Sequence, residues 1–213
     1  MRIYFRLYGE ILSAFLGKFL YFITMVMGVG ILYKKVPSGP LFLHILVFLT
    51  VIGCFTNTFM FNPTRDKYYA MILMRMDARK YTLANYGYAV LKTIVGFLPF
   101  SVLFGLWQGL HPGLCLLIPF FVSGMKLAAA AGRLIRYEKT GKAPDENHLG
   151  KTGWAAFAGL LAVAYGLPAL GWVLPAAVSA VFMILGILCG FFSIKKILTF
   201  DNYRDMYQQL LIN

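Results

Sequence analysis

Residues 62–80 read NPTRDKYYAMILMRMDARK and lie between two strongly apolar runs. Asn62 followed by Pro63 has the pattern of a helix N-cap with proline in the first helical position. Asp77 offers a second N-cap, for a helix that continues into the next apolar run. The stretch therefore predicts a short helix across a membrane surface, joined by an elbow to a helix that spans the membrane.

The apolar residues of this predicted helix gather on one side, and the charges gather at its two ends. Tyr68, Ile72 and Met76 lie four residues apart and so share one face, which Tyr69 and Leu73 flank. Such a face can anchor to lipid, pack on its own protein or dock on another protein. The stretch alone leaves these alternatives open.

The composition places the chain among membrane proteins. Of its 213 residues 60% are hydrophobic, the mean hydropathy is +0.71, and only 13% are charged, about half the usual share. The net charge of +12 comes from residues in loops beside apolar runs. That placement fits membrane topology and contact with anionic lipid, and it argues against nucleic-acid binding.

Apolar segments of about 20 residues, the length that crosses a bilayer, recur along the chain. They predict an all-α polytopic protein of six spans in one domain, residues 1–213. The spans are expected near residues 13–33, 41–61, 85–107, 114–134, 154–169 and 173–194. Four further segments are expected outside them: an N-terminal surface helix at 1–17, the connecting helix at 62–80, a polar loop at 136–153, and an amphipathic helix at 200–213.

The distribution of basic residues predicts the orientation. With both termini inside the cell, only Lys34 and Lys35 of the 20 Lys and Arg fall in outer loops. Lys18, Lys92 and Lys126 lie within spans, and the remaining fifteen lie inside. This bias is typical of the positive-inside rule and predicts cytoplasmic N- and C-termini.

The sequence predicts no catalytic, cofactor or metal site. No carboxylate falls within a span, which argues against an ion-coupled carrier. The three histidines and three cysteines lie on separate segments, without metal-ligand or CxxC spacing. HLGKTG at residues 148–153 contains the GKT of a phosphate-binding loop, but Asp145 stands where that motif needs glycine. If ATP drives this protein, another subunit binds it.

Lys126 has two interpretations. It lies seven residues before Arg133, about 10 Å along a helix, so it can extend its ammonium group to the inner membrane interface. Alternatively, it faces a polar cavity within the membrane and contacts an anionic substrate.

Small residues at four-residue spacing recur in the predicted fourth to sixth spans. Gly124, Ala128 and Gly132 share one helix face, and Gly186 and Gly190 share another. Such residues let helix backbones approach closely. They predict tight packing within the bundle, with a dimer interface as the alternative.

The run FNPTRDKYYAMILMRMDARKY, residues 61–81, is followed by a span that opens NYGYAVLK at Asn85. Together with the closing FDNYRDMY at residues 200–207, it resembles the membrane subunit of bacterial ABC exporters of the ABC-2-like permease type. The resemblance extends over all six spans through their topology and involves no catalytic motif.

The resemblance implies a permease that dimerises, or pairs two six-span halves, beside soluble ATP-binding subunits. The ending LLIN, after an amphipathic helix, suits the first of two such halves. It also implies that short permease helices dock in grooves of the ATPases, for which Arg65–Met76 is the best match, with the 136–153 loop and the N-terminal helix as further contacts. The ATPase-coupling candidates are Arg65, Tyr68, Tyr69, Ile72, Leu73, Arg75, Met76, Asp77 and Arg79.

The expected function is that of a permease subunit in the bacterial cytoplasmic membrane. It would move an amphipathic or hydrophobic substrate with energy from separate ATPase subunits, and it would not itself be an enzyme. Two other classes stay open: a non-transport interaction protein, such as an immunity or sensor partner, and a membrane enzyme that acts on lipid. The second is disfavoured because no acid/base or metal set is visible.

Overall fold

The structure, a computed structural model, describes residues 12–13, 15–144, 146 and 150–212. This part of the chain is helical and contains no strand. Its elements are η1 (Phe22–Gly28), α2 (Ser38–Thr56), α3 (Arg65–Tyr68), η2 (Tyr69–Leu73), α4 (Ala78–Trp107), α5 (Pro112–Thr140), α6 (Lys151–Leu161), η3 (Ala162–Gly166), α7 (Leu167–Ala169), α8 (Ala176–Thr199) and α9 (Tyr203–Ile212), of which the three η segments are π-helical.

Five of these helices are long and apolar enough to cross a membrane. They are α2, α4, α5, the continuous helix Lys151–Ala169 and α8. The first predicted span contains a shorter apolar helix, Phe15–Gly28. The all-α class is therefore confirmed, with five helices long and apolar enough to cross a membrane where the sequence predicted six spans. The surface helix predicted for residues 1–17 lies mostly outside the described residues.

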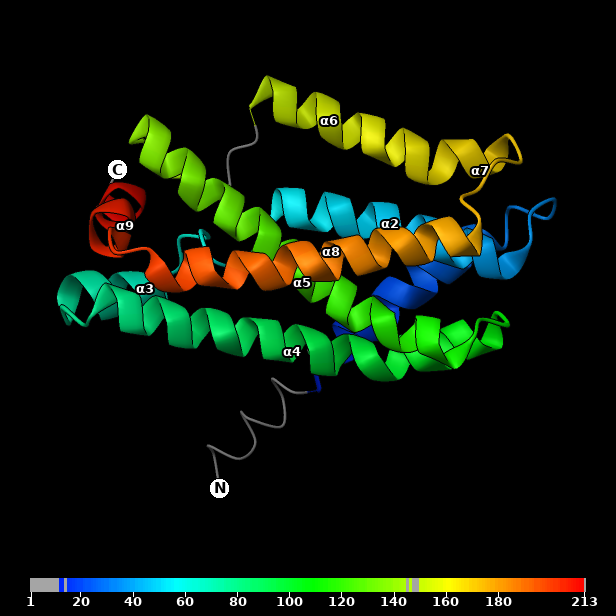
Figure 1. Cartoon of the computed structure of the whole chain (residues 1–213), viewed down its shortest axis with the longest axis horizontal. Coiled ribbons are helices and arrows are strands. Elements are labelled where there is room, and N and C mark those ends of the chain that lie inside the picture. The colour runs from blue at the N-terminus through cyan, green and yellow to red at the C-terminus, as the bar shows by residue number, and fades with distance from the viewer. Residues whose placement is uncertain (1–11, 14, 145, 147–149, 213) are drawn as a thin grey trace.

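The long helices lie side by side, with α6 along one side of the bundle and α4 along the other (Figure 1). Most side chains of α2 and α5 are buried, whereas α4, the α6–α7 helix and α8 expose most of theirs. Many of the exposed side chains are large and apolar, among them Leu, Ile, Val and Phe. Such a surface is stable against lipid and unstable against water, as expected for a bundle embedded in a membrane.

The α3–η2 elbow and α9 lie at one end of the bundle, which we call the elbow end (Figure 1). α4 has 30 residues and is about 45 Å long, more than the ~30 Å of a bilayer's hydrocarbon core. α5 is nearly as long and continues to Thr140, where Gly141 ends it with a left-handed φ of 66°. The polar loop predicted for residues 136–153 is therefore shorter, because its first and last residues belong to α5 and α6.

Glycines bring α5 and α8 into close contact, as their spacing predicted. A Cβ added to Gly190 would lie 2.3 Å from the Cα of Gly124, and one added to Gly124 would lie 2.7 Å from the carbonyl oxygen of Gly186. Only glycine fits at such a separation. A Cβ at Gly132 would meet nothing within 4 Å. Gly132, which the sequence predicted as part of this face, therefore does not contribute to the contact between α5 and α8.

The first helix of the elbow differs from the helix that the sequence predicted. The N-cap is Thr64, whose hydroxyl accepts from the backbone N–H of Lys67, and not Asn62. The α-helix lasts only to Tyr68 and widens into the π-helical η2, so the expected 3.6-residue periodicity is lost. Arg75 then turns the chain with φ 52°. The second cap is confirmed: Asp77 accepts from the N–H of Lys80 and begins α4.

The C-terminal helix α9 packs on its own protein. The sequence predicted an amphipathic surface helix, and its apolar face proves to be buried through Tyr203, Met206 and Tyr207. The Tyr203 hydroxyl donates to the carbonyl of Ile197, and the Tyr207 hydroxyl donates to that of Met60. α9 therefore closes a second, smaller hydrophobic core at the elbow end, separate from the core among the long helices.

His44 of α2 joins the hairpin formed by the α6–α7 helix and α8. Its Nε2 lies 3.0 Å from the carbonyl oxygen of Val163, and the N–H of Leu174 donates to its Nδ1 at 3.2 Å. Because a carbonyl accepts and an amide N–H donates, the imidazole is neutral with its proton on Nε2.

We expect His44→Phe to lower the free energy of unfolding by about 1–2 kcal/mol, because a phenyl ring leaves both backbone groups without a partner. Thermal unfolding in mild detergent measures the change. His44→Gln, which offers a donor and an acceptor, is expected to recover part of the loss. Equal stability of the Phe variant and the wild type would refute this role.

Candidate functional site: a lysine-lined cavity

The bundle contains a partly open cavity of about 760 Å³. Its walls come from the Phe15–Gly28 helix and the residues just before it, from α2, α4 and α5, and from the chain between α2 and η2. A volume of this size is within the range of small-molecule binding sites. The lining residues are Ser13, Gly17, Lys18, Tyr21, Leu49, Thr50, Gly53, Phe59, Asn62, Thr64, Asp66, Lys67, Tyr81, Asn85, Tyr88, Ala89, Lys92, Thr93, Phe97, Val122 and Lys126.

α4 supplies one whole side of the cavity. Tyr81, Asn85, Tyr88 and Lys92 recur every three or four residues and therefore line one face of the helix. Phe97, further along α4, also lines the cavity and belongs to the main hydrophobic core. The wall thus changes from polar near the elbow end to apolar deeper in the bundle.

Four lysines line this cavity, and Asp66 is the only carboxylate among its described lining residues. Two of the lysines are buried, namely Lys67 and Lys126. Lys18 is partly buried and Lys92 is exposed. The cavity is therefore strongly positive, and its field attracts anions.

The ammonium group of Lys67 is fully engaged by backbone carbonyls. It donates to the oxygens of Phe59, Met60 and Asn62 at 3.2, 2.8 and 2.9 Å, which matches its three N–H donors. Burial lowers the pKa of Lys67 to about 8, and the negative charge of Glu146 opposes this shift. Lys67 thus holds the loop between α2 and α3 in place.

Lys126 lies at the cavity wall in the middle of α5. Its ammonium group donates to the carbonyl of Asn57 at 2.6 Å and lies 3.9 Å from the centre of the Phe59 ring. The side chain is only 9% exposed and lies among the residues that line the cavity. Contact of Lys126 with a substrate stays a prediction.

The end of α2 and the loop that follows it are held by cations from distant parts of the chain. Besides the contacts of Lys67 and Lys126, Arg133 donates to the carbonyl of Phe55 at 2.6 Å. Lys126 and Arg133 thereby satisfy carbonyls at the C-terminus of α2, where positive charge is stabilising. The sequence does not indicate this arrangement, because Lys126 and Arg133 of α5 lie 69 and 78 residues from the carbonyls that they meet.

A buried carboxylate, that of Glu146, connects the polar loop to the chain just after α2. Glu146 accepts hydrogen bonds from the backbone N–H and the hydroxyl of Thr58 and forms an ion pair with Arg133. Its side chain is 2% exposed. The sequence placed Glu146 in a surface loop and gave no indication that it is buried.

The ATPase-coupling candidates divide into two groups. Arg79 and Asp77 have structural roles: Arg79 donates to the carbonyl of Leu198 at 2.5 Å and pairs with Asp201 at 3.2 Å. Asp77 caps α4, and its hydrogen bond from the N–H of Lys80 lowers its pKa. The remaining candidates lie on the elbow: Ile72 is partly exposed, and the exposed ones are Arg65, Tyr68, Tyr69, Leu73, Arg75 and Met76.

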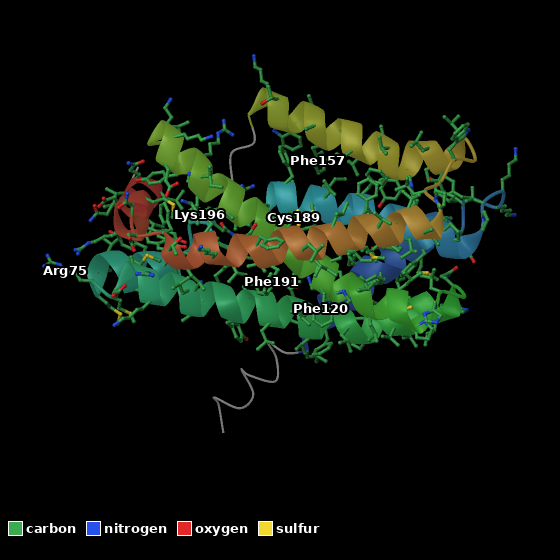
Figure 2. All side chains as sticks on the ribbon, in the orientation of Figure 1. Arg75, Phe120, Phe157, Cys189, Phe191 and Lys196 are labelled. Atoms are coloured by element: carbon green, nitrogen blue, oxygen red, sulfur yellow. The ribbon has the colours of Figure 1, made fainter. Side chains whose placement is uncertain are left out.

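Several apolar side chains of the elbow are exposed, whereas Ala70 and Met71 are buried. Met74 is 71% exposed, and Arg75 extends from the tip (Figure 2). We use the name elbow surface for Tyr69, Leu73, Met74, Arg75 and Met76.

Among the described residues, no group of three or more His, Cys, Asp or Glu lies close enough to hold a metal ion. Comparisons of the chain with family models, with curated proteins and with solved structures find no match.

Proposed function

We propose that this chain is the permease subunit of an ATP-driven exporter in the bacterial cytoplasmic membrane. The observation that supports this best is the large cavity between its apolar helices, polar near the elbow end and apolar deeper in the bundle. A cavity of that kind accepts a molecule with a polar head and an apolar body. An amphipathic substrate is thus better matched than a polar one.

The orientation proposed for this function has the elbow end facing the cytoplasm. That end holds the basic residues of α3 and of the elbow, and also those near the C-termini of α5 and α8. At the opposite end, Lys34 and Lys35 precede α2. The positive-inside rule favours this orientation, with a cytoplasmic C-terminus, and the sequence favours a cytoplasmic N-terminus.

Energy would come from a separate soluble ATP-binding subunit. The GKT at residues 150–152 lies at the start of α6, and no strand precedes it in the described residues. A phosphate-binding loop needs such a strand. The elbow surface offers a partner an exposed apolar patch with one positive charge, rigidly connected to α4 through the Asp77 cap.

We expect the double variant Met74→Asp/Arg75→Asp to lose most of its ATPase partner during purification in mild detergent. The change replaces an apolar and a positive contact with two negative ones, while Asp tolerates the left-handed backbone at position 75. Quantitative mass spectrometry of the co-purified ATPase measures the loss, which we expect to exceed tenfold.

The matched control is Leu32→Asp/Lys34→Asp at the opposite end, where both side chains are exposed and the change in charge is the same. This control is expected to retain the ATPase. Undiminished co-purification with the elbow variant, inserted in the membrane at wild-type level, would remove the docking assignment.

A second candidate function is that of a non-transport interaction protein, such as an immunity or sensor partner. The exposure of the elbow surface favours it as well, since any protein partner can use an apolar patch. The same purification separates the two functions, because this alternative predicts a stoichiometric partner without an ATP-binding site.

A further inference from the structure

We propose that the cavity binds an anionic amphiphile, with its headgroup held between Lys18 and Lys92 and its acyl chain along the apolar wall. The inference deepens the proposed permease function and rests on it for the fate of the ligand, whereas binding itself follows from the cavity. It assigns different roles to the four lysines of the cavity.

Lys18 and Lys92 both line the cavity and lie near each other, although they belong to different helices. The stem of Lys18 lies over Gly96 of α4, where an added Cβ would lie 3.5 Å from its Cγ. Lys92 precedes Gly96 by one helical turn, on the same face of α4. Lys92 is close enough for its charge to act on the ammonium group of Lys18.

Lys18 and Lys92 differ from Lys67 and Lys126 in the groups that their ammonium groups contact. Lys67 and Lys126 donate to backbone carbonyls, which accounts for their ammonium groups. In the described part of the chain, Lys18 and Lys92 have neither a hydrogen-bond acceptor nor a carboxylate partner. Their contacts there are with aromatic rings: Lys18 lies 4.7 Å from the centre of the Phe97 ring, and Lys92 lies 6.0 Å from that of Tyr88.

Two neighbouring ammonium groups beside an apolar wall are unfavourable when, as among the described residues, no counter-ion accompanies them. An anion between them removes the repulsion and supplies the missing acceptors. A phosphate monoester suits the pair best, because its charge of about −1.5 to −2 matches two lysines and its oxygens can accept from both. A carboxylate provides the same chemistry with a single charge.

The rest of the cavity favours an amphiphile over a free anion. Tyr21, Leu49 and Val122 also line the cavity, and the ring of Phe97 lies against both Lys18 and Tyr21. Leu49, Phe97 and Val122 are part of the main hydrophobic core. An inorganic anion would leave this apolar surface unused, whereas an acyl chain would cover it.

The test measures binding to the purified full chain in mild detergent, without ATP or an ATPase. The probe is a lysophosphatidate with a fluorescent acyl chain, compared with lysophosphatidylcholine bearing the same chain, a fatty acid of that chain and inorganic phosphate. We expect the lysophosphatidate to bind at least tenfold more tightly than the choline lipid, the fatty acid to bind with intermediate affinity, and inorganic phosphate not to compete at millimolar concentration.

We expect Lys18→Gln/Lys92→Gln to weaken lysophosphatidate binding at least tenfold and to leave the choline lipid unaffected. The charge-keeping variant Lys18→Arg/Lys92→Arg should bind within a few-fold of wild type, which also shows that the site still folds. The matched control, Lys34→Gln/Lys35→Gln, loses the same charge at the opposite end and should bind normally.

Three outcomes would overturn the proposal: equal affinity for the two lipids, an unchanged affinity of the Lys18/Lys92 glutamine variant, or competition by inorganic phosphate as strong as by the lipid. The last would indicate a site for a free anion. Because the assay contains no ATPase, its result does not depend on whether the elbow surface docks one, and the two proposals fail separately.

Discussion

Glu146→Ala is expected to lower the free energy of unfolding by about 3–5 kcal/mol, the largest effect of any substitution considered for this chain. The carboxylate is buried and accepts from the backbone N–H and hydroxyl of Thr58 and from Arg133. Its removal leaves a guanidinium and two Thr58 donors without their partner, at the place where the loop after α5 meets the end of α2. Thermal or denaturant unfolding of the purified protein measures the change.

The matched control for this substitution is Glu138→Ala. Glu138 forms an ion pair with Lys196 at 2.6 Å, so it also has a close partner, but both side chains are partly exposed to solvent. Exposed pairs contribute at most about 1 kcal/mol. If the Glu138 and Glu146 variants lose equal stability, burial of the Glu146 pair does not have the importance that we assign to it.

Gly190→Ala is expected to destabilise the protein by about 1–3 kcal/mol. A Cβ at this position would lie 2.3 Å from the Cα and 2.5 Å from the carbonyl oxygen of Gly124. Both atoms are backbone, so the clash cannot be relieved by a change of rotamer, and α5 and α8 must move apart. The fraction of protein that remains folded after mild heating in detergent measures the loss.

Gly132→Ala is the control for Gly190→Ala, because it introduces the same methyl group into the partner helix α5. No atom outside that helix turn lies within 4 Å of the added Cβ. Alanine favours a helix by about 1 kcal/mol over glycine, so this variant should be at least as stable as wild type. Equal losses for both variants would show that the close approach of α5 and α8 does not stabilise the bundle.

The sequence predicted those parts of the fold that depend on neighbouring residues. Hydropathy located the long helices, Asp77 marked the start of α4, and the spacing of Gly186 and Gly190 marked the face of α8 that meets α5. Asn62 was wrongly predicted as a cap. The carbonyl of Asn62 instead accepts from Lys67, while the hydroxyl of Thr64 caps the helix.

The sequence could not predict contacts between distant segments. Glu146 and Thr58 are 88 residues apart, and nothing near either indicates that they meet. The same limit applies to α9: its amphipathic pattern fits a membrane surface as well as a protein surface, and only the fold shows that Tyr207 reaches the carbonyl of Met60.

The cavity is the clearest case of an arrangement that the sequence could not predict, because it depends on distant segments. Its lysines lie on four separate segments, and each by itself is typical of a side chain that extends to the membrane interface. One signal was available in the sequence: Tyr81, Asn85, Tyr88 and Lys92 place polar and aromatic groups on one face of a helix that is otherwise apolar. A polar face on a spanning helix indicates a cavity or a protein contact in place of lipid.

Native mass spectrometry of the tagged protein, released intact from its own membranes in mild detergent, tests the permease proposal most directly. We expect the chain to appear in one complex with a soluble ATP-binding subunit, carrying an anionic amphiphile that is lost in the Lys18→Gln/Lys92→Gln variant. An intact complex that contains no ATP-binding subunit would contradict the proposed function.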